Sequence, residues 1–224
     1  MTVNIGDIWG LGRHRLGCLD NGDLNAWGRL IDGTPIDAVI TDPPYGINFD
    51  TDGSGRPEGK KGRKYEPVYG DNVAFDPSPW LLYKQIVLFG SNYYPEKLPP
   101  GGALIWDKRY LSGASYMADA EIAYFNGGQG CYIYTLTSQG GYFPDAGRFH
   151  PTQKPIGLMA WCMSKAKAGK VVIDPYSGSG STLMACEYTD RVCLASEIEV
   201  SYVQQTLTRF WKATGKKPIL LDRL

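Results

Sequence analysis

The sequence predicts an α/β protein with a mostly parallel β-sheet and helices on both faces. Short apolar runs of strand length alternate with amphipathic segments along the 224 residues, a pattern typical of β-α-β units. Two of the apolar runs end in an acid followed by a proline, and the second continues into a glycine-rich turn. Because open α/β sheets bind ligands at the carboxyl ends of their strands, these acids predict a site at that edge.

The first part of the chain supplies a β-α-β unit and a long loop. Residues 14–18 form a short strand-like run, and residues 24–31 carry apolar side chains at helical spacing before the apolar strand 36–40. Residues 46–70 alternate glycines with charges and contain no pattern that could build a core. We therefore expect a mobile, basic loop over 46–70.

The rest of the chain continues the alternation. Residues 121–125 and 131–137 flank the turn signal Asn126-Gly127-Gly128 and predict an antiparallel hairpin at one edge of the sheet. Ser181 is expected to cap the helix after the glycine-rich turn. The other predicted elements are strands at 86–89, 103–106, 171–173 and 192–195 and helices at 158–166, 181–188 and from Val200 to Phe210.

Composition limits the classes of function. The formal net charge is zero, so any affinity for a polyanion must come from a local basic cluster. Five cysteines without a Cys-x-x-Cys pair and only two histidines predict buried free thiols and no metal site. The N-terminal stretch does not match a signal peptide and no apolar run has bilayer length. We expect one domain over residues 1–224, located in the cytoplasm, without a membrane partner.

Three ordered motifs resemble those of the β-class S-adenosylmethionine-dependent DNA amino-methyltransferases. They are Asp42-Pro43-Pro44-Tyr45, His150-Pro151-Thr152-Gln153-Lys154-Pro155, and Asp174-Pro175-Tyr176-Ser177-Gly178-Ser179-Gly180. The resemblance implies a Rossmann-like methyltransferase fold with a seven-stranded sheet, S-adenosylmethionine as cofactor, and transfer to adenine N6 in DNA. The compact chain also resembles versions carried by phages. Whether it would serve a restriction-modification system or act as an orphan enzyme stays open.

The cofactor side is expected at the glycine-rich turn. Gly178 and Gly180 allow a ligand to approach the backbone at a helix N-terminus, and Glu197 follows the next strand, where an acid accepts hydrogen bonds from ribose hydroxyls. By resemblance, Asp20 binds the adenine amino group, with Asp23 as the alternative, and Lys154 lies near the methionine carboxylate. The resemblance also assigns Asn92, Thr152, Gln153, Asp174, Pro175 and Ser177 to the cofactor.

The catalytic side is expected at Asp42-Pro43-Pro44-Tyr45. The Asp42 carboxylate and the Pro43 carbonyl can each accept one proton of an exocyclic amine, the two prolines stiffen the turn, and Tyr45 stacks on the base. An adenine in a duplex must be flipped out to reach such a pocket. The segment 56–64 of the loop contains five basic residues and a single acid, and this excess of positive charge predicts contacts with DNA phosphates. The basic residues are Arg56, Lys60, Lys61, Arg63 and Lys64.

Several alternatives stay open on the sequence alone. Cytosine-N4 methylation is one, although that chemistry usually shows serine where this chain has Asp42, and RNA adenine is another target. A catalytically silent nucleic-acid-binding module of the same fold is a third. Residues 107–150 leave room only for a reduced target-recognition region, so specificity could also come from loops or from a second subunit of a homodimer.

Overall fold

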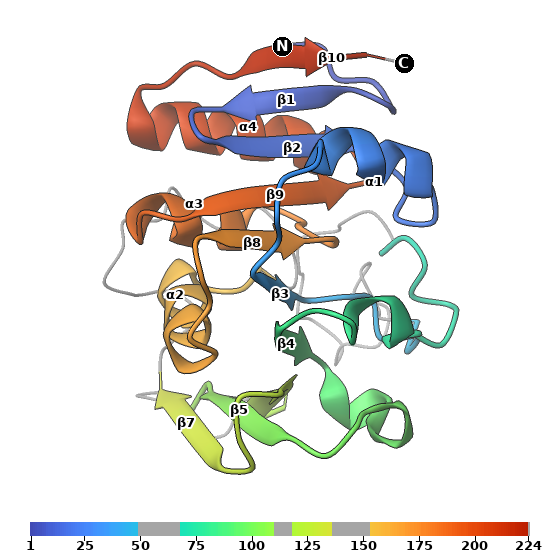
Figure 1. Ribbon diagram of the computed structural model, residues 1–224, viewed down its shortest axis with the longest axis vertical. Helices are drawn as coiled ribbons and strands as arrows, with labels where there is room; N and C mark the ends of the chain where they lie inside the picture. Colours follow the sequence, from blue (N-terminus) through green and yellow to red (C-terminus); the bar gives the residue numbers. More distant parts are fainter. Residues whose placement is uncertain (49–67, 110–117, 136–152, 224) are drawn as a thin grey trace, which may run out of the picture.

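The computed structural model describes residues 1–48, 68–109, 118–135 and 153–223, and within these ranges ten strands form one sheet with four α-helices (Figure 1). The strands are β1 (Ile8–Leu11), β2 (His14–Cys18), β3 (Ala38–Thr41), β4 (Gln85–Phe89), β5 (Gly102–Asp107), β6 (Ala120–Phe125), β7 (Cys131–Thr135), β8 (Val171–Asp174), β9 (Val192–Glu197) and β10 (Ile219–Asp222). The α-helices are α1 (Leu24–Ile31), α2 (Ile156–Lys165), α3 (Ser181–Tyr188) and α4 (Val200–Thr214), and the short 3-10 helices are η1 (Ser78–Trp80), η2 (Ser91–Tyr93) and η3 (Pro95–Lys97).

The centre of the sheet is parallel. The strand order is β10-β1-β2-β9-β8-β3-β4-β6-β5-β7, and the five strands from β2 to β4 run in the same direction. From the centre, β3 leads to β4 on one side and β8 leads to β9 on the other. The predicted α/β class is confirmed, and β3 and β8 flank the point at which the chain connections diverge.

The sheet has ten strands, whereas the family resemblance implies seven and the sequence pattern predicts eight. Strands β1 and β10 are the unpredicted ones, and they extend the sheet beyond β2 by antiparallel pairing. A tight turn at Gly12-Arg13 joins β1 directly to β2, and β1 is a short apolar run, Ile8–Leu11, that the sequence prediction misses. All four residues of β10 are exposed, so this strand shows none of the alternation that marks a half-buried strand.

The predicted edge hairpin of residues 121–125 and 131–137 does not form. Strand β5 lies between β6 and β7, antiparallel to β6 and parallel to β7. The β6–β7 connection crosses the start of β5 at Gly102, where a Cβ atom would lie 2.7 Å from the Gly130 carbonyl oxygen and 2.8 Å from that of Gly128. Because Gly102 has no side chain, the connection can pass across β5, and the glycine-rich turn signal belongs to this crossing.

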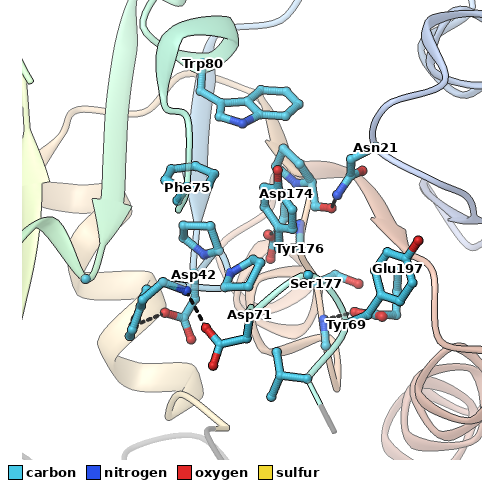
Figure 2. A pocket seen from close by; sticks show the side chains of 18 of the residues that line it. Asn21, Asp42, Tyr69, Asp71, Phe75, Trp80, Asp174, Tyr176, Ser177 and Glu197 are labelled. Carbon is cyan, nitrogen blue, oxygen red and sulfur yellow. Dashed lines mark hydrogen bonds between the residues drawn. The ribbon is translucent and has the colours of Figure 1, made fainter. Parts of the chain in front are cut away.

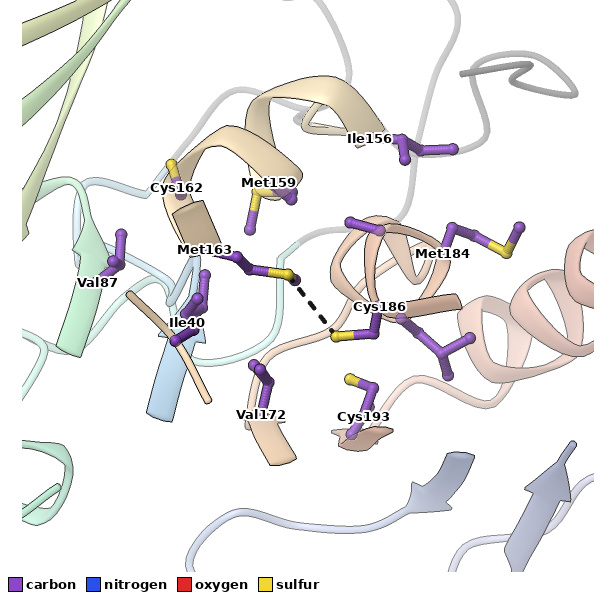
Figure 3. Close-up of a cluster of buried hydrophobic side chains, with 14 of the residues drawn as sticks. Ile40, Val87, Ile156, Met159, Cys162, Met163, Val172, Met184, Cys186 and Cys193 are labelled. Carbon is purple, nitrogen blue, oxygen red and sulfur yellow. Dashed lines mark hydrogen bonds between the residues drawn. The ribbon is translucent and has the colours of Figure 1, made fainter. Parts of the chain in front are cut away.

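Two hydrophobic cores cover the two faces of the sheet. Ala38 and Ile40 of β3 point into the core formed with α2, α3 and α4, while Val39 points into the core formed with α1 and η1. Figure 3 shows the first core, where the Cys186 Sγ lies 3.9 Å from the Met163 Sδ. The prediction of helices on both faces is confirmed.

The cysteines follow this packing with one exception. Cys18, Cys162, Cys186 and Cys193 are buried free thiols as expected, whereas Cys131 is exposed. Cys131 begins β7, the edge strand beyond β5. Its side chain therefore lacks a covering layer that the central strands have.

Replacing Gly102 by alanine is expected to lower the free energy of unfolding by about 1–3 kcal/mol, because the added methyl group collides with the crossing connection. Urea denaturation followed by circular dichroism measures the change. The matched control is Gly28→Ala in α1, where a Cβ atom meets nothing within 4 Å and helix propensity favours alanine by about 0.5–1 kcal/mol. An unchanged free energy of unfolding for Gly102→Ala contradicts the proposed crossing.

Candidate active site

The carboxyl ends of the parallel strands open into a cleft of about 1600 Å³ (Figure 2). A single small ligand usually occupies roughly 300–1,000 Å³, so this cleft has room for two. The four acids that the sequence places at strand ends, Asp20, Asp42, Asp174 and Glu197, all line it. The structure therefore brings the predicted catalytic and cofactor sides into one cavity.

The two motif strands are direct neighbours. Strands β3 and β8 pair in parallel through residues 38–39 and 172–173. Beyond these pairs, the Thr41 hydroxyl donates a hydrogen bond of 2.6 Å to Asp174 Oδ1. Asp42 follows Thr41 in the chain, so the end of β3 is tied to the start of the glycine-rich turn.

The glycine-rich turn adopts a backbone that favours glycine. Gly178 and Gly180 have φ values of 50° and 78°, in the left-handed region that side chains disfavour. A Cβ atom on Gly180 would lie 2.5 Å from the Thr206 methyl group on α4. Gly178 lines the cleft, while Gly180 packs against α4. Gly180, rather than the predicted Ser181, is the N-cap of α3, because the left-handed turn places Ser181 within the helix.

The two cleft acids at the ends of β8 and β9 have pKa values raised toward neutral pH. Burial raises the pKa of Asp174 to about 6 and that of Glu197 to about 7. Glu197 Oε2 accepts a hydrogen bond of 2.8 Å from the Gly178 N–H, and its Oε1 accepts one of 2.9 Å from the Glu199 N–H. Each carboxylate oxygen keeps a further lone pair, so Glu197 can still accept hydrogen bonds from hydroxyl groups of a ligand.

The acids after β2 have different roles. Asp20 is exposed and lines the cleft, whereas Asp23 is the N-cap of α1 and accepts hydrogen bonds from two helix N–H groups. Between them, Asn21 donates to the Pro175 carbonyl and accepts from the Ser196 hydroxyl at 2.5 Å. Asn21 thus fastens the loop after β2 to the ends of β8 and β9, a long-range contact that no local pattern announces.

An aromatic wall adjoins these acids. Tyr176 contacts Phe75 and Trp80 edge to face, with ring centroids 5.8 Å and 6.1 Å apart, and Figure 2 shows all three lining the pocket. The sequence pattern does not reveal this wall, because its members come from distant segments. Such rings can hold a planar base. The other predicted cofactor residues that line the cleft are Asn92, Gln153, Pro175 and Ser177.

Both oxygens of Asp42 have partners. Its Oδ1 accepts a hydrogen bond from the Tyr45 hydroxyl, and its Oδ2 lies 2.5 Å from the Lys154 Nζ. Burial raises the pKa of the Asp42 carboxyl, while the positive charge of Lys154 acts in the opposite direction. Lys154 therefore favours the ionised form of Asp42 in surroundings that would otherwise favour its protonation.

Lys154 lies between two carboxylates. Its Nζ is 2.5 Å from Asp42 and 2.8 Å from Glu121, and only 4% of its side chain is exposed. Although burial lowers the pKa of Lys154, the two carboxylates raise it above its usual value. Lys154 thus lines the cleft at its Asp42 side, and its contact with the methionine carboxylate stays a prediction.

Glu121 on β6 is the second acid that pairs with Lys154, and the sequence prediction misses it. Its other oxygen lies 3.1 Å from the Lys108 Nζ, so Asp42, Lys154, Glu121 and Lys108 form a chain of alternating charge. An acid within the otherwise apolar run 120–125 is the signal that could have marked it.

Tyr45 fits against a glycine. Its ring stacks on Tyr93 with centroids 5.0 Å apart and an interplanar angle of 17°. A Cβ atom on Gly90, whose φ is 71°, would lie 2.1 Å from the Tyr45 ring. The absence of a side chain at Gly90 therefore leaves space for the Tyr45 ring. Stacking of Tyr45 on a nucleobase stays a prediction.

Some predicted site residues lie outside the described ranges. They are Arg56, Lys60, Lys61, Arg63, Lys64 and Thr152. Among the residues that are described, no group of three or more His, Cys, Asp or Glu side chains could hold a metal ion. Within the same ranges, none of the helices has both the length and the apolar composition needed to cross a membrane.

Comparison with known proteins finds a matching family model and similar sequences. The N6/N4 family model described as DNA methylase matches residues 100–208. YubD of Escherichia coli (strain K12), described as a methylase, is 26% identical over 180 residues, which is 76% of this chain and 79% of YubD. The type II methyltransferase M2.MboI of Moraxella bovis is 29% identical over 113 residues, which is 50% of this chain and 41% of that relative.

Solved structures share the fold. The crystal structure of the M1.HpyAVI–SAM complex is similar with a TM-score of 0.50 and 21% identity, over 82% of this chain and 94% of that one. The cytosine-N4-specific PvuII DNA methyltransferase has a TM-score of 0.50 and 13% identity, over 80% and 82% of the two chains. The matched family model, the related sequences and the shared fold together support an S-adenosylmethionine-dependent DNA methyltransferase, without distinguishing N6 from N4 enzymes.

Proposed function

We propose that the protein transfers a methyl group from S-adenosylmethionine to the N6 amine of adenine in DNA. The observation that carries this proposal is the joint placement of Asp42-Pro43-Pro44-Tyr45 and the glycine-rich turn at neighbouring strand ends in one cleft. Direct transfer requires the methyl donor and the accepting amine to meet in a fixed orientation. Adjacent strands can hold the two ligands in that way.

The residues on the β8–β9 side fit S-adenosylmethionine, whose sulfonium supplies an electrophilic methyl group when bound. Gly178 offers close backbone approach, and Glu197 offers carboxylate oxygens to ribose hydroxyls. The aromatic wall of Phe75, Trp80 and Tyr176 offers a surface for adenine. Asp20, at the same side of the cleft, is the acceptor proposed for the adenine amino group.

Asp42 would activate the accepting amine. The lone pair of an exocyclic amine is delocalised into the ring, and hydrogen bonds to Asp42 and to the Pro43 carbonyl localise it. Positive charge then develops on the nitrogen, and an ionised Asp42 stabilises that charge in the buried site. Lys154 favours the ionised carboxylate. An amine that displaces the Tyr45 hydroxyl from Oδ1 would free the Tyr45 ring to stack on the base.

A base in a DNA duplex reaches such a cleft only after flipping out of the helix. The cleft volume supports a second ligand beside the cofactor. We assign the phosphate contacts of the substrate to the basic cluster of residues 56–64, which carries a local excess of four positive charges in a chain of zero formal net charge.

Cytosine N4 is the second candidate target. The matched family covers N6 and N4 enzymes, and the fold is shared with the cytosine-N4-specific PvuII enzyme. Asp42 could activate either amine by the same hydrogen bonds. The aspartate of Asp42-Pro43-Pro44-Tyr45, where cytosine enzymes usually carry serine, favours adenine.

Incubation of the protein with methyl-labelled S-adenosylmethionine and unmethylated genomic DNA is expected to yield N6-methyladenine on nucleoside analysis. Asp42→Ala should lower kcat by about 10²–10³-fold, because it removes the charge that stabilises the developing cation, while the Kd for S-adenosylmethionine stays within about twofold. The control is Asp32→Ala, which removes a carboxylate that is 75% exposed and should leave both values unchanged. Label found as N4-methylcytosine contradicts the adenine assignment, and full activity of Asp42→Ala contradicts the mechanism.

The affinity for S-adenosylmethionine is expected to fall as the pH drops below about 7. Glu197 has a pKa of about 7, so acidification protonates the carboxylate that accepts the ribose hydroxyls. Glu197→Gln should raise the Kd about tenfold at high pH, the equivalent of one hydrogen bond to a charged group, and remove most of the pH dependence. Only the step near pH 6 from Asp174 should remain.

Isothermal titration calorimetry across this pH range measures the effect on cofactor binding. The matched control is Glu96→Gln at an exposed position in η3, which should bind like the unmodified protein at every pH. Equal affinities for Glu197→Gln and the unmodified protein would exclude Glu197 from the cofactor site.

A further inference from the structure

Three consecutive backbone N–H groups, at the end of the Asp42-Pro43-Pro44-Tyr45 motif and just after it, point to one carboxylate oxygen. Asp71 Oδ1 accepts hydrogen bonds from Tyr45 at 2.9 Å, Gly46 at 2.9 Å and Ile47 at 3.3 Å. Successive N–H groups that point to a common centre form a nest, a backbone concavity suited to anions. In this protein, the anion in the nest is a side chain of the protein itself.

Backbone contacts clamp the same two segments together. The Asp71 carbonyl accepts a hydrogen bond of 2.8 Å from the Asn48 N–H. Gly46 has a φ of 78°, and a Cβ atom there would lie 2.7 Å from the Val73 carbonyl oxygen. The turn after Tyr45 is therefore shaped to lie directly against the residues that follow Asp71.

The Asp71 carboxylate is in a position to act on the turn that carries Tyr45. Asp71 is only 5% exposed, and Figure 2 shows it beside Asp42 at the cleft. The Tyr45 ring is fixed by stacking on Tyr93 and its hydroxyl by Asp42, while the Tyr45 backbone is fixed by Asp71.

We propose that Asp71 is a positioning residue for methyl transfer, which holds the Tyr45–Ile47 backbone so that Tyr45 and the Asp42 carboxylate face the target base. This inference rests on the proposed function. Without the carboxylate, three N–H groups lose their common acceptor and the turn relaxes, which displaces the Tyr45 ring. None of the residues proposed to bind the cofactor belongs to the Tyr45–Ile47 turn, so we expect cofactor binding to be unaffected. Asp71 should therefore determine kcat but not cofactor affinity.

The test compares Asp71→Ala and Asp71→Asn with the unmodified protein. A displacement of about 1 Å in catalytic geometry costs about a hundredfold in rate, so Asp71→Ala should lower kcat by about that factor with the Kd for S-adenosylmethionine unchanged. Asp71→Asn keeps an acceptor oxygen without the charge, and it should recover kcat to within about tenfold. Hydrogen-exchange mass spectrometry should show faster amide exchange at residues 45–47 in Asp71→Ala.

The control is Asp7→Ala, which removes a buried carboxylate that accepts a 2.9 Å hydrogen bond from the Asn4 N–H just before β1, outside the cleft. It should leave kcat and the exchange at residues 45–47 unchanged, so a loss of kcat in Asp7→Ala equal to that in Asp71→Ala overturns the positioning role. Unchanged kcat and exchange in Asp71→Ala also overturn it. If the unmodified protein methylates no DNA, the proposed function fails, while the exchange measurement still decides whether Asp71 holds the turn.

Discussion

The arrangement of the site depends on the parallel pairing of β3 with β8. The chain continues from β3 to β4 on one side of the pair and from β8 to β9 on the other, so a crevice opens between the loops that follow β3 and β8. The hydrogen bond from Thr41 to Asp174 continues the connection past the last paired residues. It sets Asp42 next to the glycine-rich turn without relying on flexible segments. A shift of β3 against β8 by one residue would turn Asp42 to the opposite face and separate the two halves of the site.

The site is also a place where charge is buried at a cost. Asp42, Lys154, Glu121 and Lys108 alternate in sign, and this pairing offsets part of the free energy needed to remove them from water. The carboxylate of Glu197 accepts its hydrogen bonds from the Gly178 and Glu199 backbone N–H groups, and burial raises its pKa to about 7, above the usual value for glutamate. Between its usual pKa and about 7, the folded state holds a proton that the unfolded chain has released. Its contribution to stability therefore falls as the pH rises through this range. Ligand hydroxyls that bind the ionised form would recover part of that cost.

The local elements could be predicted from the sequence, but the contacts between distant residues could not. The bounds of α1 and α3 match their predicted ranges because apolar periodicity and turn residues specify a helix locally. The predicted hairpin does not form because the connection between β6 and β7 passes across β5 at Gly102, and local periodicity does not specify this strand order. Within the site, strand-end acids were predictable from position alone. The pairing of Lys154 with Glu121 and the nest around Asp71 join segments far apart in the chain, and hydrophobic periodicity carries no information about such partners.

The central claim is that one cleft holds the methyl donor and the accepting amine in direct contact. A bisubstrate analogue, in which adenosine N6 is linked by a short alkyl chain to the position of the cofactor sulfur, tests it most directly. Its affinity can be measured by calorimetry beside that of S-adenosylhomocysteine. The account predicts that the analogue binds more tightly than S-adenosylhomocysteine and that Asp42→Ala and Glu197→Gln each weaken it. An analogue that binds no better than S-adenosylhomocysteine and is insensitive to Asp42→Ala would contradict the account.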